Sequence, residues 1–166
     1  MKNKYLWVGA IVGIVLVLDQ YTKYLVEKHI SLHEVIPIIP GFFNLTHARN
    51  PGAAFSLLST APANFRIVFF ITVTVIALVI IAVLIRKTHE HLLLIAFSLI
   101  AGGAIGNNLI DRVRYGEVVD FIQWYYRSYY WPSFNIADSA ITIAVVLLAV
   151  DMLFVKKPRG EENARS

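Results

Sequence analysis

The chain has 166 residues, of which 57% are hydrophobic and only 16% are charged, and its formal net charge is +4 at pH 7. A mean hydropathy of +0.63 excludes an ordinary soluble domain and indicates that lipid surrounds much of the chain. The sequence contains no cysteine, which excludes disulfide frameworks, thiolate metal sites and cysteine nucleophiles. Several basic residues flank apolar segments, which is typical of membrane proteins rather than of nucleic-acid-binding proteins.

Four segments have the length and composition of membrane-spanning helices. The first begins at Tyr5 and runs for about twenty residues, through Asp19 and Lys23. The others are Ile67 to Ile85, Leu92 to Ile110 and Ala137 to Val155. We therefore expect an all-α membrane protein with four transmembrane helices, forming a single domain over residues 1–157 with a polar tail over residues 158–166.

The connections between these segments differ in length and charge. Residues 86–91 are short and basic, whereas residues 27–65 and 112–135 are long and mixed. The positive-inside rule places the short basic connection and both termini in the cytoplasm, and the long connections on the other side. Residues 34–46 mix β-branched and aromatic residues with Pro and Gly, which predicts short strands. The aromatic residues of the last connection are typical of a membrane-interface belt; they are Trp124, Tyr125, Tyr126, Tyr129, Tyr130 and Trp131.

Two aspartates at the outer ends of apolar segments are the leading candidates for catalysis. The third span leaves the membrane and the fourth enters it on the same side, so the carboxylates of Asp120 and Asp138 are expected to face each other. Taken singly, Asp120 is also explained as a loop residue and Asp138 as a helix N-cap. Two close carboxylates share one proton, so that one is a base and the other an acid, as water-driven peptide hydrolysis requires. We predict a membrane aspartyl protease in which Asn135 orients a carboxylate.

Other polar residues border the spans. Asp19 and Lys23 lie four residues apart on one helical face, which favours a structural ion pair. Asn50 and Gly52 belong to a turn-rich piece that would bring backbone amides close to a substrate, although the pattern alone indicates only a loop. The third span carries small residues that favour close helix packing, Gly102, Gly103, Ala104 and Gly106, and it ends in the polar residues Asn108, Asp111 and Arg112. A scaffold role is favoured for Asp111, and scaffold and substrate contact are equally open for Arg112.

The remaining polar residues do not favour another kind of hydrolysis. The histidines are scattered, and the sequence contains no HExxH spacing, so we expect no metal and no other cofactor. The sequence also lacks a GxSxG nucleophile elbow, which leaves serine hydrolysis with little support.

Five separated motifs together resemble bacterial lipoprotein signal peptidase, also called signal peptidase II. They are Asp19-Gln20-x-x-Lys23, Asn50-x-Gly52-Ala53-Ala54-Phe55, Asn108-x-x-Asp111-Arg112, Val118-Val119-Asp120-Phe121 and Phe134-Asn135-x-Ala137-Asp138-Ser139. The resemblance implies a four-helix inner-membrane enzyme with cytoplasmic termini, a small periplasmic β-cradle and a short amphipathic periplasmic helix. It also implies cleavage of prolipoproteins immediately before a diacylglyceryl-modified cysteine. We expect a monomer whose partners are these substrates and membrane lipids.

The resemblance assigns roles to individual residues. Asp120 and Asp138 match the family's catalytic pair, and the other characteristic polar positions are matched by Asp19, Lys23, Asn50, Asn108, Arg112 and Asn135. The family usually has Gly-Asn-x-x-Asp-Arg in the third motif, so counting back from Asp111 selects Asn108 and puts Asn107 where Gly is usual. A one-residue helix bulge would instead present Asn107, and both assignments stay open.

Two other classes of function remain open. A proton-coupled transporter or channel would use Asp19, Asp120 and Asp138 as relay sites, but these aspartates are expected near one face of the membrane, and no inverted repeat is visible. A non-catalytic scaffold would use the same polar residues only to hold helices together. The Gly-x-Gly-Asp signature of presenilin-type proteases does not occur, which sets that subclass aside.

Overall fold

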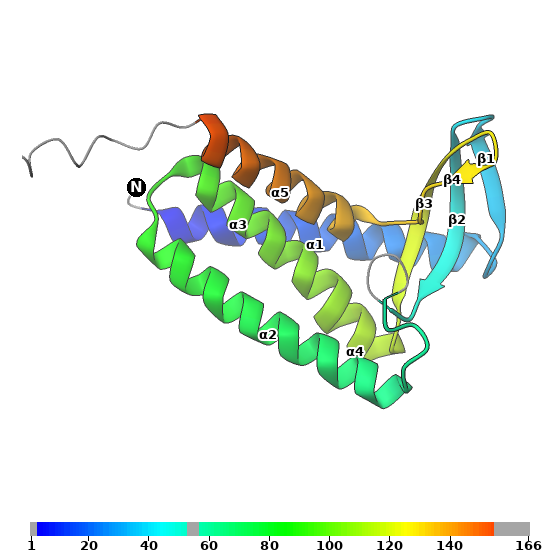
Figure 1. Ribbon diagram of the computed structural model, residues 1–166, viewed down its shortest axis with the longest axis horizontal. Helices are drawn as coiled ribbons and strands as arrows, with labels where there is room; N and C mark the ends of the chain where they lie inside the picture. Colours follow the sequence, from blue (N-terminus) through cyan, green and yellow to red (C-terminus); the bar gives the residue numbers. More distant parts are fainter. Residues whose placement is uncertain (1–2, 53–56, 155–166) are drawn as a thin grey trace, which may run out of the picture.

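Four long helices run alongside one another, and a small antiparallel sheet lies at one end of them (Figure 1). This computed structural model describes residues 3–52 and 57–154. The helical segments are α1 (Lys4–His29), α2 (Ala63–Lys87), α3 (His91–Ala104), η2 (Ile105–Asp111), α4 (Arg112–Tyr115) and α5 (Ile136–Phe154). Because α3, η2 and α4 form one continuous helix, four helices are long and apolar enough to cross a membrane, which confirms the expected spans.

Three of the four spans are longer than the apolar segments that predicted them. α1 has 26 residues, because it continues beyond its apolar part through Glu27, Lys28 and His29; Glu and Lys are favourable helix formers. The third span continues to Tyr115 and contains the seven-residue π-helix η2. A π-helix accommodates an extra residue in the turn, so the residues after it are shifted relative to a regular α-helix.

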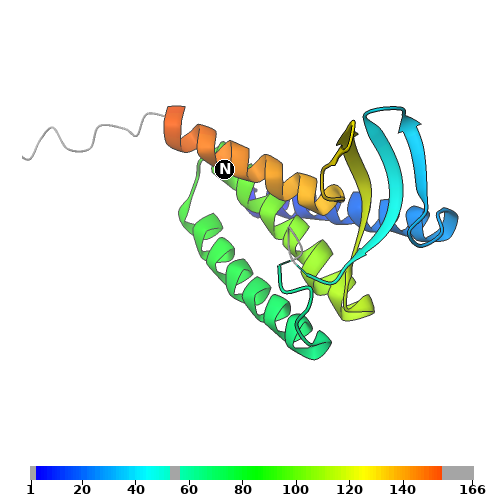
Figure 2. The ribbon, with the colours of Figure 1, turned by 45° about the vertical axis from the view of Figure 1, so that its right-hand side comes forward.

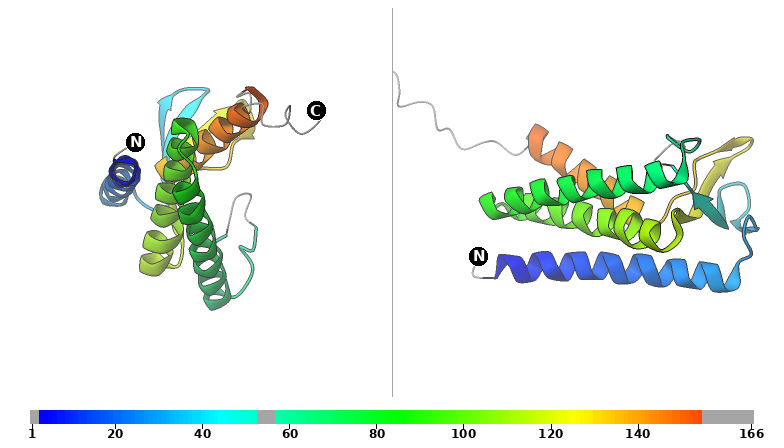
Figure 3. Two further views of the ribbon diagram at one scale, coloured as in Figure 1. Left: turned by 90° about the vertical axis from the view of Figure 1, so that its left-hand side faces the viewer. Right: turned by 90° about the horizontal axis from the view of Figure 1, so that it is seen from below.

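α3 is the central helix and contacts α1, α2 and α5 (Figure 3). The glycines on α3 allow this close packing. A Cβ atom on Gly102 would lie 2.9 Å from the Cβ of Val15 on α1, and a Cβ on Gly103 would lie 2.6 Å from the carbonyl oxygen of Ala137 on α5. The small-residue stripe therefore packs between two neighbouring helices, as its composition predicts.

The helix ends opposite the sheet are joined by a buried lysine. Figure 1 shows the start of α1 and the connection between α2 and α3 at this end of the bundle. The Lys4 ammonium donates to the carbonyl oxygens of Ile85, Arg86 and Thr88 at 3.0, 2.9 and 3.2 Å. These carbonyls belong to the C-terminal end of α2, where a positive charge is favourable. Lys4 thus acts as a C-terminal cap supplied by another helix.

The sheet has the strand order β1-β2-β3-β4, with β1 (Val35–Ile39), β2 (Phe43–Asn50), β3 (Val118–Tyr126) and β4 (Tyr129–Tyr130). The first two strands begin within residues 34–46, so the expectation of short strands there is confirmed. The last turns of α1 run beside the sheet (Figure 2). A buried apolar cluster joins the two elements and consists of Val26, Ile30, Val119 and Phe121.

The interpretation of Asp120 as a loop residue is wrong, because it lies in β3, the longest strand of the sheet. Residues 118–126 are mainly β-branched and aromatic, and this composition favours a strand. β3 pairs with β2 so that Ala48 is opposite Asp120 and Asn50 is opposite Val118. The pairing brings the end of β2 close to the Asp120 carboxylate. Most of the predicted aromatic belt lies on β3 and β4.

The short amphipathic helix implied by the resemblance does not occur as a separate element among residues 3–52 and 57–154. Residues 57–60 form turns, and Leu58 has a φ of 64°, which interrupts any helical path there. Ala53, Ala54 and Phe55 of the second motif lie outside the described residues, as does the polar tail at 158–166.

Candidate active site

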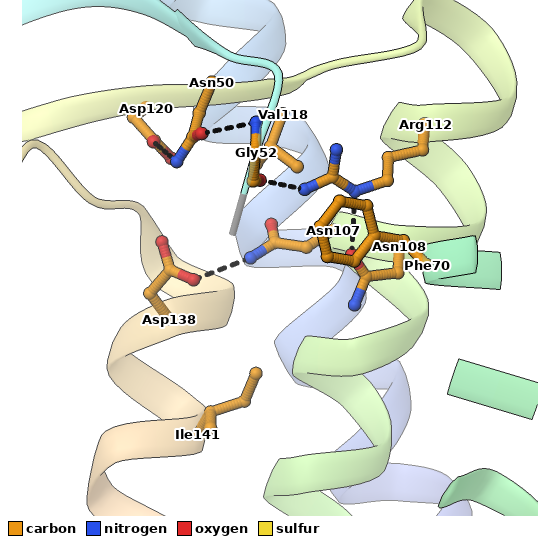
Figure 4. A pocket seen from close by; sticks show the side chains of 10 residues that line it. All are labelled: Asn50, Gly52, Phe70, Asn107, Asn108, Arg112, Val118, Asp120, Asp138 and Ile141. Carbon is orange, nitrogen blue, oxygen red and sulfur yellow. Dashed lines mark hydrogen bonds between the residues drawn. The ribbon is translucent and has the colours of Figure 1, made fainter. Parts of the chain in front are cut away.

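A pocket lies where the third span, α5 and the sheet meet (Figure 4). It is lined by residues from six elements and the turn after β2: Asn50, Gly52, Phe70, Asn107, Asn108, Arg112, Val118, Asp120, Asp138 and Ile141. Both predicted catalytic aspartates are in this set. β3 supplies Asp120 and the first turn of α5 supplies Asp138, so residues from two connected but different elements meet here.

The first turn of α5 is held by a reciprocal pair of hydrogen bonds. The backbone N–H of Asp138 donates to Asn135 Oδ1 at 2.9 Å, and the backbone N–H of Asn135 donates to Asp138 Oδ2 at 3.2 Å. Asn135 precedes the first helical residue, Ile136, so it is the N-cap, and Asp138 is the third helical residue. The interpretation of Asp138 itself as the N-cap is therefore wrong, because the helix begins at Ile136, three residues before the start at Ser139 that a cap at Asp138 requires.

Asn135 also reaches the other aspartate. Its side-chain nitrogen donates to Asp120 Oδ1 at 2.8 Å and to the carbonyl oxygen of Val119 at 3.2 Å. Asn50 donates to Asp120 Oδ2 at 3.2 Å, and its own side-chain oxygen accepts from the backbone N–H of Gly52 at 3.0 Å. Amide groups therefore fix both oxygens of Asp120, and one of these amides belongs to the residue that also caps α5.

Burial makes ionisation of Asp120 unfavourable. The residue is only 3% exposed. Burial, together with the nearby Asp138, raises the pKa of Asp120 from 3.8 to about 7, although hydrogen bonds from Asn50 and Asn135 act in the opposite direction. Near neutral pH, a large share of Asp120 therefore keeps its proton, and the carboxylic acid is available as a hydrogen-bond donor.

A buried charge cluster lies behind the pocket. The Lys23 ammonium is 2.7 Å from Asp19 Oδ2 and 2.7 Å from Asp111 Oδ2. The side-chain nitrogen of Gln20 donates to Asp19 and Asp111 at 3.1 and 2.8 Å. Asp19 also accepts the backbone N–H of Ala137 on α5 at 3.0 Å. The predicted Asp19–Lys23 ion pair is thus confirmed and is extended by Asp111, which fits the scaffold role favoured for that residue.

The π-helix η2 separates the two neighbouring asparagines. Asn107 donates its side-chain nitrogen to Asp138 Oδ1 at 2.8 Å, and its side-chain oxygen accepts from Lys23 at 2.7 Å. Asn108 instead accepts from Arg112 Nε at 2.9 Å. The residue beside the α5 aspartate is therefore Asn107, as the bulged alternative predicts, while Asn108 lines another part of the pocket.

Arg112 connects the pocket to the turn after β2. Its guanidinium donates to the carbonyl oxygens of Pro51, at 3.0 Å, and of Gly52, and it lies 4.0 Å from the ring centroid of Phe70 on α2. Phe70, which contacts Arg112, and Gln20, which contacts Asp19 and Asp111, are not predicted as site residues from the sequence. Gln20 had a signal, because it stands inside the first motif, whereas Phe70 is one apolar residue among many in its span.

The site has the parts needed for acid–base hydrolysis. It contains two neighbouring carboxyl groups, amides that hold their oxygens, and one carboxyl, that of Asp120, which keeps its proton in a large share of molecules near neutral pH. Within residues 3–52 and 57–154, no group of three or more metal-binding side chains is arranged to hold a metal ion.

A family model and the similar proteins of known name all point to one protein family. The family model described as Signal peptidase (SPase) II matches residues 11–154. The chain is 52% identical to a lipoprotein signal peptidase of Geobacter sulfurreducens, over 92% of this chain and 95% of that protein. It is 45% identical to a lipoprotein signal peptidase of Geobacter metallireducens, over 98% and 100% of the two chains.

A solved structure described as a bacterial membrane enzyme, determined by the in meso method at 2.3 Å resolution, has a TM-score of 0.78 and 36% sequence identity to this chain. The similarity covers 91% of this chain and 92% of that one. The family match extends over nearly all of the described residues and includes every element that lines the pocket. The chain therefore belongs to the signal peptidase II family and is a multi-pass membrane peptidase.

Proposed function

We propose that this protein is an aspartic endopeptidase that removes signal peptides from prolipoproteins by cleaving immediately before the diacylglyceryl-modified cysteine. The observation that carries the proposal is the shared pocket of Asp120 and Asp138, with Asp120 protonated in a large share of molecules near neutral pH. Its family supports the substrate class, since the relatives are lipoprotein signal peptidases.

The two aspartates have different roles in the proposed reaction. Asp138 is the base and removes a proton from a water molecule, whose oxygen attacks the carbonyl carbon of the scissile bond. Asp120 is the acid and donates a hydrogen bond to the carbonyl oxygen as negative charge develops there. The tetrahedral intermediate then breaks at the C–N bond, and a proton from the carboxyl pair goes to the leaving amine. No covalent bond to the enzyme is needed.

The other predicted site residues support this pair. Asn135 and Asn50 hold the oxygens of Asp120, while Arg112 holds the backbone at Gly52 beside the pocket. Asn108 in turn accepts from Arg112. We assign these four polar side chains to orientation of the reacting groups and of the loop that borders them. The Asp19–Lys23 pair belongs to the cluster behind the pocket.

The arrangement fits a substrate that is anchored in lipid. The pocket lies at the sheet end of the spans, between helices whose outer faces are apolar and exposed, including Val68, Val145 and Val146. Diacylglyceryl chains would stay in the bilayer while the peptide bond before the modified cysteine reaches Asp120 and Asp138. Membrane lipids are accordingly part of the working environment of the enzyme, which we propose acts as a monomer.

We further propose the inner membrane as the location, with both termini in the cytoplasm and the pocket on the periplasmic side. Lys4, Arg86 and Lys87 all lie at the helix ends opposite the sheet, and positive charges of this kind favour the cytoplasmic side. This orientation puts the sheet and the aspartates outside, where exported prolipoproteins are exposed.

The test is cleavage of a diacylglyceryl-modified prolipoprotein by purified protein in detergent, without added metal. We expect the wild type to release the signal peptide, and Asp120→Asn and Asp138→Asn variants of equal folded fraction to lose at least 1000-fold in kcat, about 4 kcal/mol of transition-state stabilisation. A substrate without the lipid should be cleaved poorly. Full activity of either variant would exclude the aspartate pair, and a folded wild type without activity would favour a transporter or scaffold.

A further inference from the structure

The ammonium of Lys23 has three hydrogen-bonding partners, and only two of them are charged. It contacts Asp19 Oδ2 and Asp111 Oδ2, and its third contact is the side-chain oxygen of Asn107, each at 2.7 Å. An ammonium group has three N–H donors, so each of the three has a partner. Lys23 is 2% exposed and is not among the residues that line the pocket, so it is placed to act on the site only through its neighbours.

The contact with Asn107 controls which end of the amide faces the pocket. A side-chain amide has an acceptor oxygen and a donor nitrogen on opposite sides. Since Lys23 carries no acceptor, it binds the oxygen, and the nitrogen is turned toward Asp138 Oδ1, to which it donates at 2.8 Å. The reverse orientation would place the amide oxygen against the Asp138 carboxylate and leave an ammonium N–H facing an NH2 group. Lys23 therefore selects one orientation of Asn107.

An amide nitrogen beside Asp138 stabilises the form of the carboxylate that accepts hydrogen bonds. Oδ1 accepts from Asn107 and Oδ2 accepts from the backbone N–H of Asn135, so both oxygens have donors. Such hydrogen bonds act in favour of the ionised form of a carboxylate and hold its oxygens in one orientation. The charged groups around Asp138 are Lys23 and Asp19 on α1, Asp120 on β3, and Asp111 and Arg112 at the end of the third span.

We propose that Lys23 is a positioning residue for the peptidase reaction: by holding the oxygen of Asn107, it keeps the amide nitrogen turned toward Asp138 and maintains Asp138 as the ionised, water-activating member of the pair. This inference rests on the proposed function. It gives the buried cluster a role beyond tying helices together, because the positive charge of α1 reaches the reacting carboxylate through a single amide.

The variant that tests this role must not leave a buried negative charge without its partner. Lys23→Met combined with Asp111→Asn removes one positive and one negative charge, so the net charge of the cluster does not change. Asp111→Asn keeps an oxygen that accepts from Gln20. A matched control is Lys28→Met, the same substitution at an exposed position of the same helix. A second test, Asn107→Leu, keeps the Asp19–Lys23–Asp111 contacts and removes only the amide.

The measurements are kcat, KM and the pH profile of kcat for a lipid-modified prolipoprotein, each normalised to the folded fraction. We expect kcat to fall about 100-fold in the double variant and in Asn107→Leu, with KM within twofold of wild type, because a misoriented group near the chemistry has an effect of this size. The acidic limb of the profile should move to higher pH, because the Asp138 carboxylate has lost a donor. Lys28→Met should behave as wild type.

A purely structural role predicts a different result. If kcat per folded molecule stays within threefold of wild type and the pH profile does not move in Asn107→Leu, the proposal is overturned, even if the double variant fails to fold. Failure of the proposed function looks different again, because the wild type would then be inactive or Asp138→Asn would retain full activity.

Discussion

Asn135 donates its side-chain nitrogen to Asp120 at 2.8 Å while its side-chain oxygen caps the helix that carries Asp138. One residue thus fixes the position of both carboxyl groups. The distance between the two aspartates depends on the start of α5, because the same asparagine defines that start. Asn135 therefore has two roles, capping α5 and positioning Asp120, and mutation can remove one role without the other.

Asn135→Ser should keep the cap and remove the contact with Asp120, because Ser is a good N-cap residue but has no amide nitrogen. Asn135→Ala should remove both and destabilise the protein by a further ~1 kcal/mol. We expect kcat to fall at least 30-fold in both variants, whereas the unfolding temperature in detergent falls clearly only in Asn135→Ala. Asn44→Ala, at a buried asparagine that bonds to Gln123 in the same sheet, is the control for loss of an amide. Equal activity of Asn135→Ser and wild type would contradict this account.

The pH dependence of cleavage should show the raised pKa of Asp120. Because the acid must be protonated, kcat/KM should fall as the pH rises through about 7, the pKa of Asp120 in the folded protein. The measurement is a profile of kcat/KM from pH 4 to about 9 in detergent of constant composition. A descending limb that begins only above about pH 9 would show that Asp120 is not the acid of the reaction.

Stability should depend on pH through the same group. The folded-state pKa of Asp120 is above its ordinary value of 3.8, so between these values the folded protein binds more protons than the unfolded one. This contribution therefore destabilises the fold as the pH rises from about 4 to about 7 and then becomes constant. The unfolding temperature of wild type should fall relative to Asp120→Asn over this range. Parallel curves for the two proteins would contradict the raised pKa.

Gly103→Ala should reduce activity by moving α5. The added methyl group would lie 2.6 Å from the carbonyl oxygen of Ala137 and 2.7 Å from Ile141, next to Asp138. Overpacking of this kind costs ~1–3 kcal/mol, and we expect a fall of at least 10-fold in kcat because the aspartate moves with its helix. Gly9→Ala is the matched control, because nothing lies within 4 Å of the Cβ it would add. If both variants have the same activity, close α3–α5 contact is not needed for the site.

Lys4→Met should destabilise the protein and leave the chemistry unchanged. The ammonium of Lys4 satisfies three carbonyl groups at the end of α2, and the residue is 7% exposed. Leaving such carbonyls without a donor costs ~1–3 kcal/mol. The unfolding temperature should fall while kcat per folded molecule stays within twofold of wild type. A large loss of kcat at an unchanged unfolding temperature would show that this end of the bundle influences the pocket.

Much of the fold is predicted by composition and periodicity. The four spans follow from long apolar runs, and the first two strands follow from β-branched and aromatic residues between Pro and Gly. The strand that carries Asp120 is missed because its aromatic residues also fit a membrane-interface belt, and only pairing with β2 decides between these alternatives. The alternative in which Asp138 caps α5 misplaces the start of the helix, because a helix cap depends on hydrogen bonds rather than on hydropathy.

Some residues of the candidate site are predictable from the sequence, and some of its contacts are not. Asp120 and Asp138 are singled out because they lie at the outer ends of apolar segments, and the Asp19–Lys23 pair because a four-residue separation puts both side chains on one helical face. The choice between Asn107 and Asn108 does not follow from spacing, since counting in steps of three or four assumes a regular helix. Contacts such as Gln20 with Asp111 join residues 91 positions apart, and no local pattern reports them.

The wide turn of η2 determines in which direction around the helix axis the later side chains of the third span point. One residue of an α-helix corresponds to about 100° of rotation, so deleting a single residue from η2 would turn Asp111 and Arg112 away by roughly that angle. Asp111 would then lose its ion pair with Lys23. Arg112 would lose its contacts with the Phe70 ring and with the carbonyl oxygen of Gly52. The extra residue thus sets the orientation of the last part of the third span: it turns Asp111 toward Lys23 on α1, and Arg112 toward Phe70 on α2 and the turn after β2.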